Sequence, residues 1–324
     1  MKHDMLEITP APRDYISDLI ILGDRSLIAV TCWDGSITIY EYAADRAVEL
    51  KVRLVHQYAL TSCCYVTTLL GSKLYAGSVQ GEILEVDLEL NRFRTVQNSI
   101  AQLGISDMCQ YRSSIICGSW DGWIQAVDCD TNSVVTHTKL PEDQKVLSMD
   151  ANEDKLIVAA TGNTTRWFQL PLKDESGFEA ESGLKYQARK IKLIPAGDGY
   201  VSSSLDGRVA VEYFDDDSRK FAFRCHRMNL VDTSFVFPVN ALAFVPGETT
   251  LYTGGSDGYV SCWNLDTRKK IEQLPKFNED SVVHLACSRQ ILVVATSDDS
   301  FKTNAIINDD STPLLPSRLY ILYL

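Results

Sequence analysis

Short runs in which apolar and polar residues alternate recur along the whole chain, and small-residue turns separate them. In one copy, residues 254–258 read Gly-Gly-Ser-Asp-Gly and lead into the alternating run Tyr259–Trp263. The strand-like run Leu251–Thr253 precedes the same turn. Asp-Gly between two such runs is the strongest short-range signal for a β-hairpin, because the turn requires a positive φ that glycine adopts freely. The pattern therefore predicts a series of β-hairpins.

The spacing of the turns predicts how the hairpins are assembled. The turn glycines are Gly35, Gly81, Gly122, Gly207 and Gly258. Their spacings are 46, 41, 85 and 51 residues, and 85 is about two periods of the roughly 40–45 residues of a WD40 blade. Copies that lose the Asp-Gly occur at residues 161–168 and 296–301. One such unit cannot bury its own apolar face and must stack on its neighbours. We therefore predict an all-β fold, a seven-bladed WD40 β-propeller that forms a single domain over residues 1–324.

A closed ring leaves only short, protected strand edges, so the two ends of the chain must be joined. The segments Leu6–Ile8 and Arg318–Leu324 are both strand-like. We expect them to meet in the blade that closes the ring. No amphipathic helical stretch of convincing length competes with this interpretation.

The cysteine content indicates neither disulfides nor a metal site. The nine cysteines include no Cys-x-x-Cys pair, so we expect small buried strand residues in a reducing compartment and no zinc. A charged-then-apolar leader and an apolar run long enough for a bilayer are both lacking, which predicts no membrane association. There is also no P-loop and no dinucleotide fingerprint, so we expect no cofactor.

The charge of the chain is unevenly distributed. The net charge of −12 disfavours direct binding to nucleic acid or to an anionic membrane. From Lys185 to Arg227, however, nine basic residues face six acidic ones, a local net charge of +3. This segment is either a solvated blade surface or a local anion site, since a local patch can attract anions on an acidic body.

Two arginines in this segment favour the anion site. Arg208 directly follows the turn residue Gly207, and Arg224 ends the strand-like run Phe221–Arg224. If the two runs are hairpin neighbours, their guanidinium groups meet, and such a pair is tolerated most easily with an anion between them. The planar guanidinium fork suits phosphate, whereas a neutral threonine would gain little. Pairing with the acidic run Asp215–Asp217 is the rival explanation.

Other chemistry is weakly indicated. Residues 254–258 match the G-x-S-x-G elbow of hydrolases, but that elbow turns into a helix. Here an alternating run follows, so Ser256 belongs to the repeat and we expect no enzyme. His226 lies between Arg224 and Arg227, and we assign it to the polar surface.

Two tryptophans stand in turns and not in strands. Trp33 and Trp120 each precede an Asp-Gly pair, which places them at the rim or top of a blade. Large aromatics are less needed there for packing, and tryptophan is a favoured anchor of protein interfaces. The sequence leaves two roles open for these side chains: they either pack at the rim of the blade or contact a partner protein.

Several longer sequence segments are more specific to one protein family than the blade repeat is. They occupy residues 11–18, 80–84, 181–187, 206–212, 221–227, 276–283 and 295–304. On these strings the chain resembles the budding-yeast type of the third-Bub-protein family, the spindle-checkpoint WD40 proteins within the wider Bub/Rae WD-repeat family. The resemblance covers nearly the whole chain.

The resemblance implies a non-enzymatic adaptor of the nucleus and kinetochore, a monomeric propeller within hetero-complexes. Its partners would be checkpoint kinase and kinase-like proteins, bound through GLEBS-type segments, and phosphorylated Met-Glu-Leu-Thr motifs of the kinetochore scaffold. Carried over by position, Arg208 and Arg224 would hold the phosphothreonine. Arg189 would pair with an acidic residue of the GLEBS-type segment, with Trp33 and Trp120 on the same face.

Two other functions compete with this one. The Rae-type messenger-RNA export factor also takes a GLEBS-type segment, from a nuclear-pore partner, although the acidic balance and the strings above argue against it. A propeller hydrolase would use Ser256 or an acid in the channel, but no residue set in the sequence supplies the base.

Overall fold

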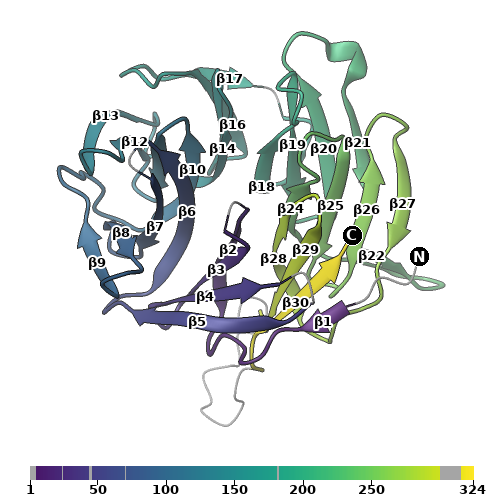
Figure 1. The fold of residues 1–324 in the computed structure, drawn as a ribbon. Coiled ribbons are helices and arrows are strands. Elements are labelled where there is room, and N and C mark those ends of the chain that lie inside the picture. Colours follow the sequence, from purple (N-terminus) through teal and green to yellow (C-terminus); the bar gives the residue numbers. More distant parts are fainter. Residues whose placement is uncertain (1–4, 24, 44–45, 70, 181, 300–314) are drawn as a thin grey trace, which may run out of the picture.

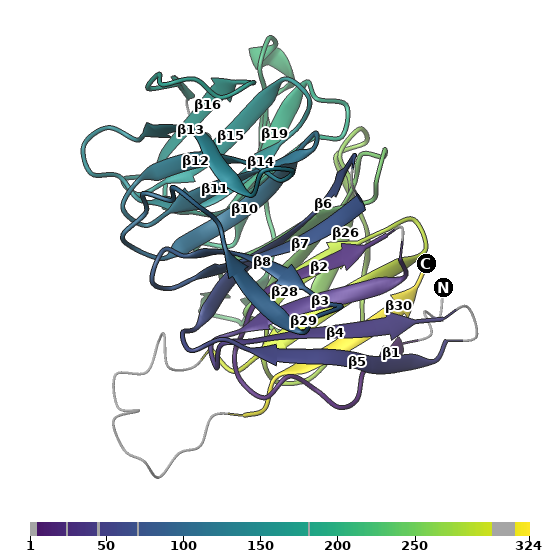
Figure 2. The ribbon, with the colours of Figure 1, turned by 60° about the vertical axis from the view of Figure 1, so that its left-hand side comes forward.

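The computed structural model describes residues 5–23, 25–43, 46–69, 71–180, 182–299 and 315–324. Seven four-stranded antiparallel sheets form a ring, and Figure 2 shows the same ring after rotation of the view in Figure 1. The predicted seven-bladed all-β propeller is confirmed. Within the described residues the only helical element is the 3-10 turn η1 (Asp217–Arg219). None of these residues lies in a helix with the length and hydrophobicity required to span a bilayer.

Blades 1 to 3 follow one another along the chain, each with its strands in sequence order. They contain β2 (Ile16–Leu22), β3 (Leu27–Cys32), β4 (Ser36–Tyr42) and β5 (Val48–Val55); β6 (Leu60–Thr68), β7 (Gly71–Ser78), β8 (Ile83–Asp87) and β9 (Arg92–Thr95); and β10 (Ile105–Tyr111), β11 (Ser114–Ser119), β12 (Trp123–Asp128) and β13 (Ser133–Lys139).

Blades 4 to 6 repeat this order, and a two-stranded hairpin is inserted between blades 5 and 6. The blades contain β14 (Val146–Ala151), β15 (Lys155–Ala160), β16 (Thr164–Gln169) and β17 (Phe178–Ala180); β18 (Ala188–Leu193), β19 (Gly199–Ser204), β20 (Arg208–Tyr213) and β21 (Phe221–Arg224); and β24 (Val239–Phe244), β25 (Thr250–Gly255), β26 (Val260–Asn264) and β27 (Lys269–Gln273). The inserted hairpin pairs β22 (Arg227–Asn229) with β23 (Ser234–Val236).

Blade 7 joins the two ends of the chain. It contains β28 (Ser281–Cys287), β29 (Ile291–Ser297), β30 (Arg318–Tyr323) and, as its outermost strand, β1 (Met5–Glu7). Leu6 lies opposite Ile321 in the β1–β30 pair. The first strands of all seven blades contact one another in a closed cycle, so they form the inner wall of the ring.

The turn glycines adopt the backbone that the Asp-Gly pattern predicts. Their φ values lie between 66° at Gly207 and 84° at Gly122. Crowding adds to this requirement, because a Cβ on Gly35 would lie 2.4 Å from the carbonyl oxygen of His56. The degenerate turn of blade 4 keeps the geometry through Gly162 and Asn163, with φ values of 80° and 57°. The copy at residues 296–301 extends into 300–314, which lie outside the described residues.

A polar bond crosses every seam between neighbouring blades, from a side chain on one blade to the backbone of the next. In ring order the bonds join Asp18 to Cys63 N, Thr61 to Ile105 O, Asp107 to Met149 N, Asp150 to Leu193 N, Ser203 to Val239 O, Asn240 to Val282 O and Ser297 to Ile16 N. Each gives a hydrogen-bond partner to a backbone group at a buried seam. The seams are therefore fixed by hydrogen bonds as well as by apolar packing.

The apolar core lies between successive blades. One cluster joins blades 7 and 1 through Ile28, Tyr40 and Val293, among others, so no blade buries its face alone. All nine cysteines are unpaired, and eight of them are buried, as the sequence predicts.

The assignment of His226 to the polar surface is wrong. The residue is 6% exposed, and its ring nitrogens lie 2.8 Å from Asp257 Oδ1 and 2.9 Å from Thr253 Oγ1. Trp263 Nε1 donates to the same threonine oxygen at 3.1 Å. His226 has a φ of 48°, and its side chain is directed into the gap between blades 5 and 6. Its charged neighbours in sequence therefore gave a misleading indication of its environment.

Candidate functional site

The three residues predicted to hold a GLEBS-type segment line one pocket of about 620 Å³, which we call the central pocket. Trp33 lies in the β3–β4 turn and Trp120 in the β11–β12 turn, while Arg189 lies on the inner strand β18. Leu205, in the β19–β20 turn, and Leu147 add apolar surface. The pocket thus combines two indoles, aliphatic side chains and one guanidinium.

The local sequence fixes both indoles. The Trp120 backbone nitrogen donates to Gly104 O at 2.9 Å, and a Cβ on Gly104 would lie 2.6 Å from the indole, so only glycine leaves room for it. In the other turn, Asp34 accepts from Ser36 N at 2.9 Å and pairs with Arg53. Trp33 remains 42% exposed on this braced turn. A large apolar side chain held open to solvent is typical of a protein-contact site.

Two cations line the central pocket, and Lys190 is paired with Asp107, so Arg189 is the one offered to a ligand. Its Nε donates to Asn240 Oδ1 at 3.1 Å. Within the described residues, no carboxylate forms an ion pair with it. Burial raises the pKa of nearby Tyr15, and the charge of Arg189 partly opposes that rise. A guanidinium without an ion-pair partner among the described residues, beside apolar walls, suits an acidic side chain flanked by apolar ones.

The two arginines predicted to hold phosphate are brought together. Arg208 on β20 and Arg224 on β21 are directly opposite each other in the antiparallel register. Directly opposed residues have Cβ atoms about 4.5–5.5 Å apart and share one face of the sheet. The expected hairpin relation is confirmed.

The rival explanation, pairing with the acidic run 215–217, is wrong. Asp216 accepts from Ser218 N at 3.0 Å, and Asp217 pairs with Lys220 at 2.7 Å. A different carboxylate approaches the pair: Asp206 Oδ2 lies 3.0 Å from Arg208 Nε. Sequence reasoning missed this contact, although the two residues flank the same turn glycine.

The arginine pair keeps an excess of positive charge. The Arg224 side chain is exposed and has no hydrogen bond or ion pair within the described residues. Arg227 Nη2 donates to the Asp206 backbone oxygen at 2.7 Å, and so braces the turn that carries Arg208. One carboxylate therefore stands against the two guanidinium groups of a directly opposed pair of residues.

A lateral pocket of about 780 Å³ begins at Arg224 and lies between blades 5 and 6. Its wall includes Met228 and Phe237 together with the cations Arg227 and Lys270. Met228 is on the inserted hairpin and is 51% exposed. The predicted phosphate site thus continues into a surface that offers both positive charge and apolar contact.

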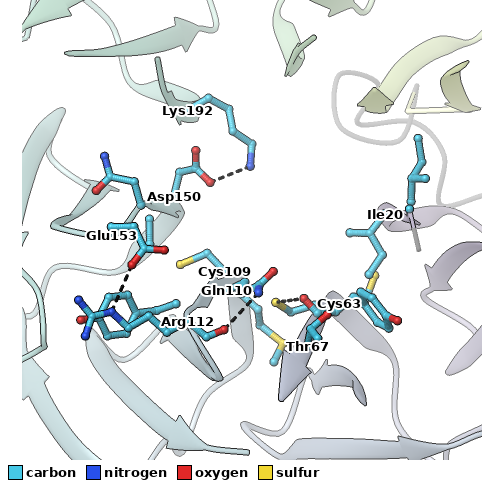
Figure 3. Close-up of a pocket in the computed structure, with 17 residues that line it drawn as sticks. Ile20, Cys63, Thr67, Cys109, Gln110, Arg112, Asp150, Glu153 and Lys192 are labelled. Atoms are coloured by element: carbon cyan, nitrogen blue, oxygen red, sulfur yellow. Dashed lines mark hydrogen bonds and ion pairs between the residues drawn. The ribbon is translucent and has the colours of Figure 1, made fainter. Parts of the chain in front are cut away.

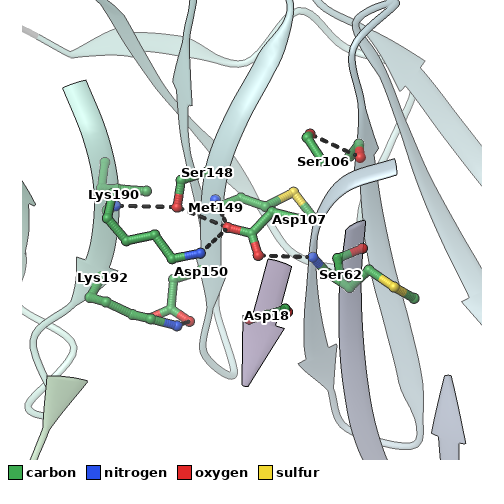
Figure 4. A network of polar contacts seen from close by, with 12 residues as sticks. Asp18, Ser62, Ser106, Asp107, Ser148, Met149, Asp150, Lys190 and Lys192 are labelled. Carbon is green, nitrogen blue, oxygen red and sulfur yellow. Dashed lines mark hydrogen bonds and ion pairs between the residues drawn. The ribbon is translucent and has the colours of Figure 1, made fainter. Parts of the chain in front are cut away.

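A buried charge network occupies the ring below the central pocket (Figure 4). Lys190 Nζ donates to Asp107 Oδ2 at 3.2 Å across the inner wall. Burial by itself raises the pKa of Asp107, but Lys190 and Lys192 together with hydrogen bonds from the next blade bring it below its ordinary value. Burial raises the pKa of Asp18, and Lys190 only partly offsets that rise. The network joins blades that are not sequential neighbours.

The opposite mouth of the ring holds a polar pocket of about 670 Å³ (Figure 3). There Lys192 pairs with Asp150 at 3.1 Å, so the cation at this mouth is compensated. Burial raises the pKa of the Cys63 and Cys109 thiols in its wall, and protonated thiols are poor nucleophiles and poor ligands. The described residues contain no cluster of side chains that could hold a metal ion.

Comparison with known proteins identifies the family. Residues 225–264 match the model of the WD domain, G-beta repeat, the segment that holds the His226 network. The mitotic checkpoint protein bub-3 of Caenorhabditis elegans is 30% identical over 283 residues, which cover 85% of this chain and 81% of the relative. The chain belongs to the Bub3 family of mitotic checkpoint WD40 proteins. The mitotic checkpoint protein BUB3.1 of Arabidopsis thaliana is 29% identical over 300 residues, which cover 90% of this chain and 86% of the relative.

Other similarities are broader than the Bub3 family. The poly(A)+ RNA export protein of Schizosaccharomyces pombe is 29% identical over 280 residues, covering 85% of this chain and 78% of its own. The solved structure of U3-55K superposes with a TM-score of 0.79 at 18% identity, over 99% of this chain and 98% of that one, which is a likeness of fold alone. None of these comparisons indicates a family of enzymes.

Proposed function

We propose that this Bub3-family chain is a non-enzymatic adaptor of the spindle assembly checkpoint, acting at kinetochores in the nucleus. It reads phosphothreonine in Met-Glu-Leu-Thr motifs of the kinetochore scaffold, and it binds GLEBS-type segments of checkpoint kinases and kinase-like proteins. The observation that carries the proposal is the direct opposition of Arg208 and Arg224 beside the lateral pocket. The propeller acts as a monomer in hetero-complexes.

The arginine pair discriminates by charge. A phosphothreonine carries about −1.5 to −2 charges and three acceptor oxygens, whereas threonine offers a single neutral hydroxyl. Asp206 engages Arg208 through Nε, so the two terminal nitrogens of that guanidinium are left for phosphate oxygens. Each charge-assisted hydrogen bond contributes about 1.5–3 kcal/mol. Loss of both arginine donors therefore weakens binding by roughly 100- to 10,000-fold.

The lateral pocket accounts for the apolar residues of the motif. In Met-Glu-Leu-Thr, two apolar side chains precede the threonine, at the first and third positions before it. Met228 and Phe237 provide apolar surface beside Arg224, and Arg227 and Lys270 provide positive charge for the intervening glutamate. The GLEBS-type segment occupies the central pocket, with an acidic side chain on Arg189 and apolar ones on Trp33 and the neighbouring indole.

Titration calorimetry with a synthetic scaffold peptide, with and without threonine phosphorylation, tests the proposal. The double variant Arg208→Ala, Arg224→Ala should lose the preference for the phosphorylated form. Arg112→Ala is the matched control, because it removes an exposed arginine at the opposite mouth of the ring, where Arg112 pairs with Glu153. Undiminished discrimination by the double variant would refute the reader function.

The similarity to an RNA export protein supports a second candidate, an export factor that holds a GLEBS-type segment of a nuclear-pore protein. The central pocket serves either function. The net charge of −12 and the directly opposed arginine pair favour the checkpoint reader. Filter binding with RNA at moderate salt separates the two, since the export factor retains RNA and the checkpoint adaptor does not.

A further inference from the structure

Arg189 is held from behind by a single buried carboxamide. Asn240 lies on β24, the inner strand of blade 6, and is 6% exposed. Its Oδ1 accepts from Arg189 Nε at 3.1 Å, across the seam between blades 5 and 6. Its Nδ2 donates to Val282 O at 3.0 Å and to Ser256 Oγ at 2.9 Å. The carboxamide is thus saturated by partners from three blades.

These contacts allow one orientation of the amide. If the carboxamide were flipped, its oxygen would face the Val282 carbonyl, and two acceptors would be buried against each other. Ser256 donates its own proton to Asp299 Oδ2 at 3.1 Å, and it therefore accepts from Asn240. The acceptor oxygen of Asn240 is consequently fixed toward Arg189.

A guanidinium held at Nε has one bidentate edge left, formed by its two terminal nitrogens. Because the group is planar, fixing Nε also fixes the direction of that edge. Arg189 lines the central pocket together with Trp33 and Trp120. Pre-organisation of this kind reduces the side-chain entropy that a partner must overcome on binding.

The absence of charge on the Asn240 side chain matters as much as its geometry. A carboxylate at position 240 would also accept from Nε, but it would compensate the charge of Arg189 and weaken its attraction for an acidic ligand. The carboxamide orients the cation and leaves its charge intact. This differs from Arg208, whose Nε is engaged by the carboxylate of Asp206.

We propose that Asn240 is a positioning residue, which aims the terminal nitrogens of Arg189 at the acidic side chain of the GLEBS-type segment. The inference rests on the proposed function of the central pocket. It adds that the pocket recognises the acid through a relay from blade 6 to blade 5, since a residue of blade 6 decides how a residue of blade 5 presents its charge.

The test is a double-mutant cycle read out by binding of a synthetic GLEBS-type peptide in calorimetry. Asn240→Ala should weaken binding by about 3- to 10-fold in the natural background and by less than about 2-fold in the Arg189→Ala background. Its effect on the melting temperature includes the loss of the seam bond to Val282 O in both backgrounds and the loss of the bond to Arg189 in the natural background alone. The signature of positioning is therefore non-additive peptide binding, which loss of a seam bond elsewhere in the ring does not produce.

Ser297→Ala is the matched control, because it removes the seam bond to Ile16 N without touching the central pocket. It should lower the melting temperature and leave peptide affinity unchanged. Asn240→Asp should weaken binding and reduce its salt dependence, because the added carboxylate compensates Arg189. Arg189→Lys tests the same contact by changing Arg189 instead of Asn240. Lysine keeps the positive charge but has no Nε to bond Asn240, so the variant should lose affinity for the peptide as Asn240→Ala does.

The outcomes are distinguishable. If Arg189→Ala leaves the affinity unchanged, the assignment of the central pocket to the GLEBS-type segment fails. If Arg189→Ala weakens binding while Asn240→Ala does not, or Asn240→Ala weakens it equally in both backgrounds, only the positioning role is overturned. Should Asn240→Ala prevent folding, full affinity in Arg189→Lys would overturn the role in the same way.

Discussion

Arg208 and Arg224 are directly opposed on neighbouring strands of blade 5, and only Arg208 has a carboxylate partner within the described residues. The two guanidinium groups are therefore not equivalent. Arg208 belongs to a braced turn, with Asp206 at its Nε and Arg227 on the backbone below. Arg224 contributes charge without an internal partner. Like charges placed opposite each other destabilise a sheet unless an anion lies between them.

This asymmetry predicts different consequences for the single variants. Arg224→Ala should leave the free energy of unfolding within about 0.5 kcal/mol of the natural protein, as expected for an exposed residue without partners. The same change should weaken binding of the phosphorylated scaffold peptide by roughly 10- to 100-fold, since charge-assisted bonds are lost. Calorimetry and urea unfolding measure the two effects. A loss of stability without a loss of affinity would assign Arg224 to the fold.

His226 gives the opposite prediction, a large effect on stability. His226→Ala removes one hydrogen bond each from Asp257 and Thr253 between blades 5 and 6, and should lower the free energy of unfolding by about 2–3 kcal/mol. His137→Ala, on the exposed face of the outer strand β13, is the control and should cost less than about 1 kcal/mol, since it loses only an edge contact with the Trp123 ring. Equal urea midpoints for the two variants would contradict a structural role for the His226 network.

The parts of the fold that the sequence predicts are those set by local chemistry. An Asp-Gly turn with positive φ specifies a hairpin over a few residues, and the hairpin register brings Arg208 opposite Arg224. The hairpin of blade 4 could be predicted although its turn lacks Asp-Gly, because Gly162 and Asn163 both accept a positive φ.

Two contacts that sequence reasoning missed join neighbouring blades through residues that are far apart in the sequence. Asn240 and Arg189 are 51 residues apart, and His226 and Asp257 are 31 apart. No short-range pattern encodes such a pair, and the charged neighbours of His226 indicate the surface when read along the chain. A polar residue inside an apolar inner strand, such as Asn240 between Val239 and Ala241, is the one signal that pointed to a seam contact.

Two turn glycines separate the effect of backbone conformation from that of crowding. Gly35 and Gly162 have nearly equal φ values of 78° and 80°. A Cβ at Gly35 would lie 2.4 Å from His56 O, whereas at Gly162 the nearest atom is Thr164 Oγ1 at 3.5 Å. Gly162→Ala should therefore destabilise by about 1–2 kcal/mol, for the positive φ alone. Gly35→Ala should lower the free energy of unfolding by at least about 1 kcal/mol more than Gly162→Ala does. Equal shifts in thermal unfolding would show that the turn relaxes freely.

The buried network at the inner wall makes stability depend on pH. The pKa of Asp107 is lowered in the folded protein, so its ion pair with Lys190 contributes fully above the ordinary value of 3.8. That contribution is lost as the pH falls below 3.8, because the unfolded chain then binds more protons than the folded one.

Lys190→Met removes the ion-pair partner of the buried Asp107 carboxylate. At neutral pH this should lower the free energy of unfolding by about 3–5 kcal/mol. Without Lys190, the effect of burial on the pKa of Asp107 is opposed only by Lys192 and the hydrogen bonds from the next blade, so the pKa is higher than in the natural protein. Protonation of Asp107 therefore costs the variant less stability than it costs the natural protein. The difference in the free energy of unfolding between the natural protein and the variant should accordingly shrink as the pH is lowered from 7 to below the ordinary carboxyl pKa. Thermal unfolding across that range measures it, with Lys51→Met, in an exposed pair with Glu41, as the control. A deficit that stays constant with pH would exclude Asp107 as the group that Lys190 compensates.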